Sequence, residues 1–200
     1  MKKIYSRKGK ALRSMAALAV LVLALHLGDL WNFTPAAALR DREREVGMER
    51  TEIITSASLY SPNRQGRVRM VLSGAGEELM VSELHFNPLT GWRCSSSWQM
   101  GRDGTSIQLD GNASGTSEGT AAFLCGWVAD RAVTVLELRL QCRRWYGTGE
   151  DIFVPVTVTE FVEFGGQRVF FLVTDAIPAT YTLRNVWLVT EKGEVLLRSW

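Results

Sequence analysis

Two histidines set the limits of acid–base chemistry in this 200-residue chain, because catalysis near neutral pH most often uses an imidazole. His26 stands inside an apolar N-terminal run. His85 alternates with Leu84 and Phe86, which predicts a strand with an exposed surface histidine. No serine–histidine or cysteine–histidine spacing typical of nucleophilic catalysis accompanies it. We therefore expect that this protein is not an enzyme.

Carboxylates offer the other catalytic and metal-binding chemistry. The pair Glu77-Glu78 has the residue type of a glycosidase acid–base pair, but neighbouring acids at the end of a strand are typical of solvated turns. The segment Asp110–Gly115 begins like a calcium loop, yet the twelfth position, where such a loop needs glutamate, is Ala121. A flexible linker explains the same residues. The sequence predicts no metal ion and no cofactor.

Basic and aromatic side chains meet in one predicted loop. Four such residues follow one another: Arg143, Arg144, Trp145 and Tyr146. They precede Gly147 at the tip of a hairpin, where aromatic residues have no structural need. Arginine next to aromatic rings suits an anionic partner, namely a lipid headgroup, a wall polymer or an acidic patch on an envelope protein. The alternative is that Trp145 packs back onto the sheet while the arginines pair with Glu150 and Asp151.

The N-terminal segment predicts a membrane anchor. Six basic residues and no acid stand in the first 14 positions: Lys2, Lys3, Arg7, Lys8, Lys10 and Arg13. The uncharged run Met15–Leu25 follows. Such an order holds the basic end on the cytoplasmic side. We expect a cytoplasmic basic segment over 1–14 and a transmembrane signal-anchor over 15–33, with the rest of this single-pass protein outside the cytoplasm.

Cleavage of that segment is the alternative. The residues directly after the apolar run offer no good small-x-small pair for signal peptidase. A cut near Ala38 would satisfy the enzyme chemically and would release a secreted protein, although Ala38 lies far downstream of the run.

The first 14 residues have a net charge of +6, and the remaining 17 basic and 21 acidic residues give −4. This balance excludes the basic face of a nucleic-acid-binding protein.

The rest of the chain predicts a mainly β fold. Thr34, Pro35 and Gly47 are start and stop signals for a short helix over 34–48. Alternating apolar residues between turn signals then predict antiparallel strands. We expect a β-rich subdomain over 49–110, a linker rich in Gly and Ser over 111–119, and a β-sandwich-like module over 120–200.

Three cysteines, Cys94, Cys125 and Cys142, leave the disulfide state open. One bridge and one free thiol are compatible with an exported protein, and three buried thiols are the alternative. If 123–128 and 133–142 form a hairpin, Cys125 lies opposite residue 135 and does not pair directly with Cys142.

Several short motifs resemble a loose set of uncharacterised, exported or membrane-anchored proteins of spore-forming Gram-positive bacteria. The motifs are the helix start from Thr34-Pro35 to Arg40, the strand Gly91-Trp92-Arg93, and Gly126-Trp127-Val128-Ala129-Asp130. The resemblance implies an N-terminal anchor or signal and a C-terminal β-module. It implies no activity and no functional residue. The lipid-anchoring cysteine usual in that set is absent here.

Together these patterns predict a membrane-anchored extracytoplasmic protein that acts as a non-enzymatic interaction module of the cell envelope. Its partners would be the membrane, through the N-terminal helix, and an envelope protein or an anionic wall or lipid component. The alternatives are a secreted hydrolase that acts on the cell wall, and an accessory or structural subunit of a membrane complex.

Overall fold

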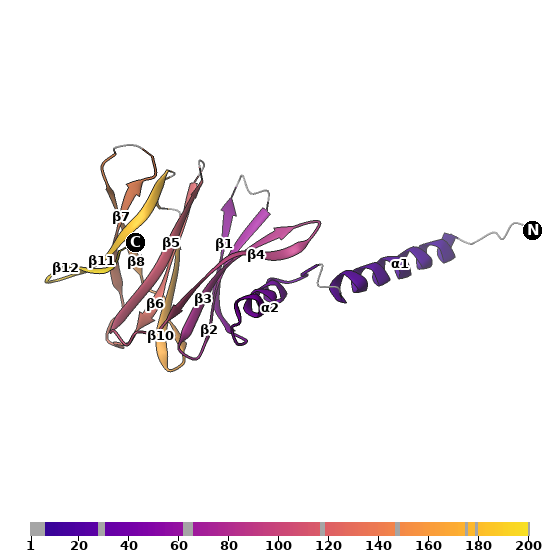
Figure 1. Cartoon of the computed structure of the whole chain (residues 1–200), viewed down its shortest axis with the longest axis horizontal. Helices are drawn as coiled ribbons and strands as arrows, with labels where there is room; N and C mark the ends of the chain where they lie inside the picture. The colour runs from indigo at the N-terminus through magenta and orange to yellow at the C-terminus, as the bar shows by residue number, and fades with distance from the viewer. Residues whose placement is uncertain are drawn as a thin grey trace, which may run out of the picture.

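The computed structural model describes residues 7–27, 31–61, 66–116, 119–146, 149–174, 176–178 and 180–199. Within these residues, helices α1 (Arg7–Leu27) and α2 (Pro35–Val46) precede strands that form three antiparallel sheets (Figure 1). The predicted mainly β, antiparallel fold is confirmed. The sequence predicts a turn over 61–66, of which residues 62–65 lie outside the described residues.

The first sheet is built from four strands that are consecutive in the chain, whereas the chain passes back and forth between the other two sheets. Sheet A has the order β1 (Glu52–Ser61), β2 (Gly66–Ala75), β3 (Glu78–Asn87), β4 (Gly91–Gly101). Sheet B has the order β5 (Ile107–Thr116), β6 (Gly119–Val128), β10 (Gln167–Thr174), β9 (Val162–Phe164). Sheet C has the order β12 (Gly193–Ser199), β11 (Tyr181–Thr190), β7 (Leu136–Arg144), β8 (Ile152–Val158). The chain therefore crosses between sheets B and C after β6, after β8 and after β10.

Sheet B is the middle layer of the stack (Figure 1). Along β6, Leu124 and Val128 pack in the core shared with sheet C, while Cys125 and Trp127 pack in the core shared with sheet A. Successive side chains of a strand point to opposite faces. A strand covered on both faces is therefore apolar at nearly every position, as β6 is.

Helix α2 covers the outer face of sheet A. The Thr34 hydroxyl accepts a hydrogen bond from the Ala37 backbone N–H at 3.2 Å, and Gly47 ends the helix in the left-handed conformation at φ 71°. Ala38 and Leu39 are buried in a core cluster with three residues of sheet A: Val71, Met80 and Leu84. The helix predicted over 34–48 is confirmed, because its start and stop signals are local.

Two predicted connections differ from the structure. Of the segment predicted as a linker over 111–119, residues 111–116 end β5 and Gly119 begins β6, and these strands pair from Ile107↔Val128 to Thr116↔Gly119. Residues 117–118 lie outside the described residues. The hairpin considered between 123–128 and 133–142 does not form, because β6 lies in sheet B and β7 in sheet C. How the chain divides into domains stays a prediction.

Helix α1 begins and ends earlier than the segment predicted to cross the membrane over 15–33. It ends at Leu27, residues 28–30 lie outside the described residues, and residues 31–33 are not helical. In the part of the chain that the structure describes, no helix is both long enough and apolar enough to cross a membrane.

Candidate functional site

The basic and aromatic residues predicted in one loop straddle the end of β7: Arg143 and Arg144 are its last two residues, and Trp145 and Tyr146 follow it. Along this strand Leu136, Leu138, Leu140 and Cys142 face the core and are fully buried. Strand alternation therefore places Arg143 on the outer face. Arg143 and Arg144 stand opposite Thr182 and Tyr181 of β11. The last two residues of β7 thus bring both guanidinium groups to one end of sheet C.

Both arginines make intramolecular contacts. The Arg143 Nε lies 3.2 Å from Asp151 Oδ1, and Gln141 donates a hydrogen bond of 2.6 Å to the other oxygen of that carboxylate. The Gln141 hydrogen bond, and then Arg143, lower the pKa of Asp151. The Arg144 guanidinium carbon lies 5.9 Å from the centre of the Tyr181 ring. Of the pairs that the alternative expected, the one between Arg143 and Asp151 is present.

Tyr146 is almost fully exposed, whereas half of the Trp145 side chain is covered. Trp145 is 50% exposed and Tyr146 is 82% exposed. The Trp145 backbone N–H donates a hydrogen bond of 2.8 Å to the carbonyl of Thr180. Thr180 has a φ of 75°, which is rare for a β-branched residue and signals local strain. The main chain of Trp145 is therefore held in place while its ring stays accessible. Residues 147–148 lie outside the described residues.

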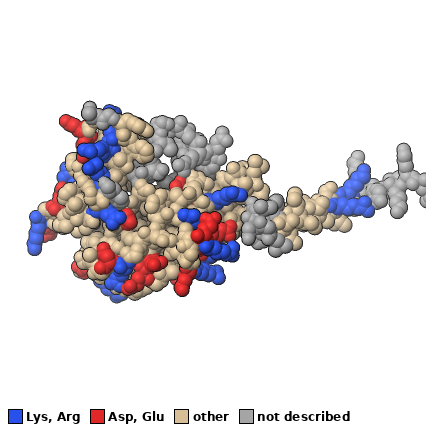
Figure 2. Space-filling model, in the orientation of Figure 1, with Lys and Arg blue, Asp and Glu red and all other residues tan. Residues whose placement is uncertain are grey.

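The site of this loop is far from α1. Sheet C, which contains β7, lies at the end of the β-body opposite to the end from which α1 extends (Figure 1). On the visible face of the body, acidic and basic side chains are interspersed, whereas α1 shows basic residues near its N-terminal end and uncharged surface beyond them (Figure 2).

Sequence reasoning missed a polar cluster around His85. Its Nε2 lies 2.7 Å from Glu83 Oε1, and the Ser96 hydroxyl donates a hydrogen bond of 2.9 Å to Glu83 Oε2. The spacing of two residues between Glu83 and His85 on one strand could have revealed that pair. A serine nucleophile needs the imidazole between serine and carboxylate. Here the carboxylate stands in the middle, so His85 is not placed to accept the serine proton.

The acidic residues considered above as catalytic or calcium-binding candidates form ion pairs with arginines. Glu77 lies 3.2 Å from Arg102 at the surface. Asp110, which begins the calcium-like segment, belongs to β5 and lies 3.6 Å from Arg198. Across the described ranges no group of three His, Cys, Asp or Glu side chains is placed to hold a metal ion.

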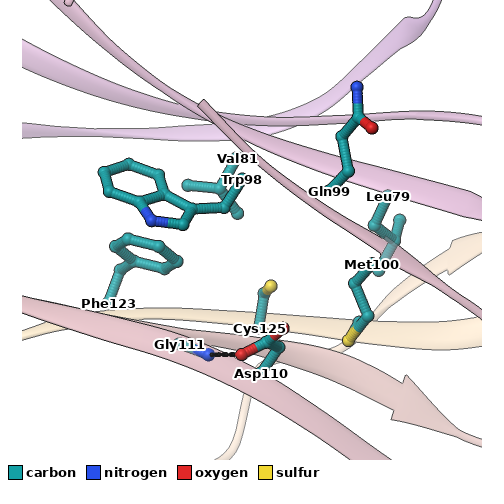
Figure 3. Close-up of a pocket in the computed structure, with 9 residues that line it drawn as sticks. All are labelled: Leu79, Val81, Trp98, Gln99, Met100, Asp110, Gly111, Phe123 and Cys125. Carbon is teal, nitrogen blue, oxygen red and sulfur yellow. Dashed lines mark hydrogen bonds between the residues drawn. The ribbon is translucent and has the colours of Figure 1, made fainter. Parts of the chain in front are cut away.

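A small pocket lies between sheets A and B (Figure 3). Trp98 and Phe123 form one wall, with ring centroids 4.8 Å apart, and Asp110 and Cys125 lie at its floor. The volume is about 10 Å³, which is room for about one water molecule. This pocket is too small for an organic substrate.

The three cysteines are free thiols. Cys94 packs beside the α2 cluster, Cys125 lies between sheets A and B, and Cys142 lies between sheets B and C. Stacked sheets are about 10 Å apart, whereas the Cα atoms of a disulfide are about 4.4–6.8 Å apart. Burial raises the pKa of all three thiols, in the case of Cys142 to about 11. Each cysteine thus behaves as a small apolar residue of a different layer.

Comparisons with known proteins add no relative: no family model matches the chain, and neither the curated proteins nor the solved structures give a match. The resemblance to exported proteins of spore-forming bacteria stays a prediction.

Proposed function

We propose that this protein is a non-enzymatic interaction module of the cell envelope, held at the membrane by its N-terminal segment with the β-body outside the cytoplasm. The observation that supports this proposal most is the surface of α1. Within the proposed anchor, large apolar side chains of the helix are exposed: Met15, Leu18, Val20, Leu21, Val22 and Leu23. Basic residues precede them. Lipid would cover the apolar side chains, and the basic residues would stay with the cytoplasmic headgroups.

The energy available from such insertion is large. Moving one such side chain from water to an apolar phase is favourable by about 1.5 kcal/mol or more. Six exposed side chains therefore offer about 9 kcal/mol before ordering costs are subtracted. This is enough to hold the chain at a bilayer. Segment 15–33, of which α1 forms the described part up to Leu27, is the proposed anchor.

The packing of α2 supports retention of this anchor. A cut near Ala38 would fall inside α2, where Ala38 and Leu39 are both buried against sheet A. The released chain would lack Thr34, which caps α2, and the first turn of the helix. Loss of a cap alone costs about 1 kcal/mol. A mature protein that begins at Leu39 would therefore start with a weakened domain.

The loop after β7 is the proposed binding surface. It offers two exposed aromatic rings next to two guanidinium groups, and the strained residue Thr180 fixes its backbone. Backbone strain persists where surrounding structure enforces it, often at binding sites. Because sheet C is the sheet remote from α1 (Figure 1), the loop lies in the layer of the body farthest from the proposed anchor. An anionic polymer of the wall therefore fits this surface better than the lipid to which α1 is bound.

Flotation and protease accessibility test the anchor. The full chain with a C-terminal tag should float with vesicles of phosphatidylcholine and phosphatidylglycerol, and protease added outside intact cells should remove the tag. The double variant Leu18→Asp, Leu21→Asp should no longer float, because two charges enter the apolar surface. Val195→Asp, at an exposed position of β12, should float like the parent. Flotation of the α1 double variant would contradict the proposed anchor.

Wall binding tests the loop. The full chain in mild detergent should bind purified cell walls, and binding should fall when the anionic polymers are stripped or when salt is raised. The variant Trp145→Ala, Tyr146→Ala should lose most of this binding, while Val195→Ala should keep it. Equal binding by the loop variant and its parent, or by intact and stripped walls, would exclude this surface.

A further inference from the structure

A second apolar surface lies near residues 31–33, which follow α1: Phe33, Phe86 and Leu89 are exposed, and Trp31 and Trp92 are half-buried. The turn between β3 and β4 begins with Asn87, whose side-chain oxygen accepts the Leu89 N–H at 2.7 Å. Pro88 occupies the position that favours proline in such turns. Leu89 at the tip is 83% exposed, the largest value among the exposed large apolar residues in the described part of the chain. Phe86, just before the turn, is also exposed and lies against Trp92, with ring centroids 5.5 Å apart.

The segment after α1 is fastened to this turn. Asn32 forms a parallel bridge with Gly91, and its carbonyl accepts the Trp92 N–H at 2.8 Å. Gly91 has a φ of 71°, and a Cβ at this position would collide with the Asn32 carbonyl and with the Trp31 ring. Only glycine allows this close approach. Trp31 in turn stacks on Phe33, with ring centroids 5.8 Å apart.

Two segments distant in sequence thus form one surface, which we call the apolar joint: Trp31, Phe33, Phe86, Leu89 and Trp92. Figure 1 shows the β3–β4 turn on the side of the body from which α1 extends. Arg93, which is exposed, follows the joint along β4. The hydrogen bond from Asn32 to Asp41 of α2, at 2.7 Å, ties the same segment to the body from the other side.

We propose that the apolar joint lies in the outer headgroup region of the bilayer, so that the body is docked on the membrane through this end of sheet A. This inference rests on the proposed anchoring of α1. Tryptophan rings favour the membrane–water interface, because their apolar body and polar N–H are both accommodated there. Phenylalanine and leucine supply the apolar side of membrane-surface segments. Leu89 would enter the lipid, and Arg93 would meet the phosphate groups.

The position of the apolar joint in the chain favours lipid as its binding partner. The joint is continuous in sequence with the apolar helix, so any membrane that holds α1 is within a few residues of Trp31. The fastening of Asn32 to Gly91 and to Asp41 prevents the segment from acting as a free tether. Docked through the joint, the body would keep sheet C, which carries the loop after β7, farthest from the bilayer.

A fluorescent probe tests the docking. In the full chain with Cys94→Ser, the two other cysteines are buried, so the dye NBD can be placed at Leu89→Cys or, as a matched control, at Leu196→Cys in the exposed part of β12. When phosphatidylcholine–phosphatidylglycerol vesicles are added, the emission at position 89 should shift to the blue and be quenched by headgroup spin labels. The emission at position 196 should not change.

The outcomes separate this inference from the proposed anchor. If the labelled chain floats with vesicles and the probe at position 89 stays in water, the docking is wrong while the anchor stands. If the chain does not float, the anchor itself fails. In addition, Leu89→Asp should weaken vesicle partition by about tenfold or more while Leu196→Asp leaves it unchanged. Equal partition of the two variants would also overturn the docking.

Discussion

Glu43 joins α2 to the start of sheet A, and its removal should destabilise the fold. The side chain is 3% exposed. Its carboxylate lies 2.6 Å from the Arg40 guanidinium and accepts hydrogen bonds from the backbone N–H of Thr51, at 3.1 Å, and from the Thr51 hydroxyl. Glu43→Ala leaves the buried donors of Thr51 unsatisfied.

The magnitude follows from these contacts. One buried unsatisfied donor costs about 1–3 kcal/mol. Breaking a buried ion pair costs about 3–5 kcal/mol, but Arg40 is 26% exposed and also donates to the Thr51 carbonyl at 2.7 Å, so most of that second cost is relieved. We expect a loss of about 3 kcal/mol in the free energy of unfolding. For a protein of this size, that lowers Tm by about 6–12 °C.

Thermal and urea unfolding of the full chain in mild detergent, followed by near-ultraviolet circular dichroism, measure this loss. Glu45→Ala is the control on the same helix, because Glu45 is 65% exposed and pairs with Arg42 at the surface. The control should change stability by about 0.5 kcal/mol or less. If Glu43→Ala is as mild as Glu45→Ala, the buried network does not hold α2 to the sheet.

Three further outcomes follow from single residues. Gly91→Ala should cost about 2–3 kcal/mol in urea unfolding because of its positive φ and its contact with the segment after α1, whereas Gly104→Ala, with φ 82° and open space around it, should cost about 1 kcal/mol; equal costs would contradict the contact. Thr180→Gly should stabilise by about 0.5–1 kcal/mol by removing strain, and a loss in Tm would contradict that strain. Burial raises the pKa of Cys142 from 9.0 to about 11, so the folded state favours the protonated thiol. The stability that this preference contributes to the folded state is intact below about pH 9 and is lost as the pH rises towards 11. Urea midpoints should show a smaller alkaline loss in Cys142→Ala than in the parent, and identical pH profiles would refute it.

Local sequence signals predicted helix α2, whereas the structure of segment 111–116 depends on strand pairing that local signals do not predict. Thr34, Pro35 and Gly47 act within one turn of the helix, so the sequence alone places its ends. The segment 111–116 has the composition of a linker, yet it forms the end of β5. A Cβ at Gly111 would meet the carbonyl of Phe123 and, at 2.6 Å, the Leu124 side chain. Glycine is required there by close strand packing, which composition does not reveal.

The candidate sites show the same division. The cluster from Arg143 to Tyr146 could be found from residue types alone, because its four residues are consecutive in the chain. The contact of Glu83 with Ser96 depends on a register that shifts between Glu83 and Leu84. The apolar joint depends on a bridge between Asn32 and Gly91, two residues far apart in the chain. No periodicity or motif announces such a pairing.

The central position of sheet B has a consequence for folding during synthesis. Sheet A is made of consecutive strands with short turns, an arrangement of low contact order that forms early. Its inner face, which includes Leu72, Leu79 and Val81, is covered only when β6 and β10 arrive. Until then a growing chain exposes an apolar sheet surface prone to aggregation. The ribosome must deliver nearly the whole sequence before that surface is sealed, so a chaperone has a defined interval and a defined face to protect.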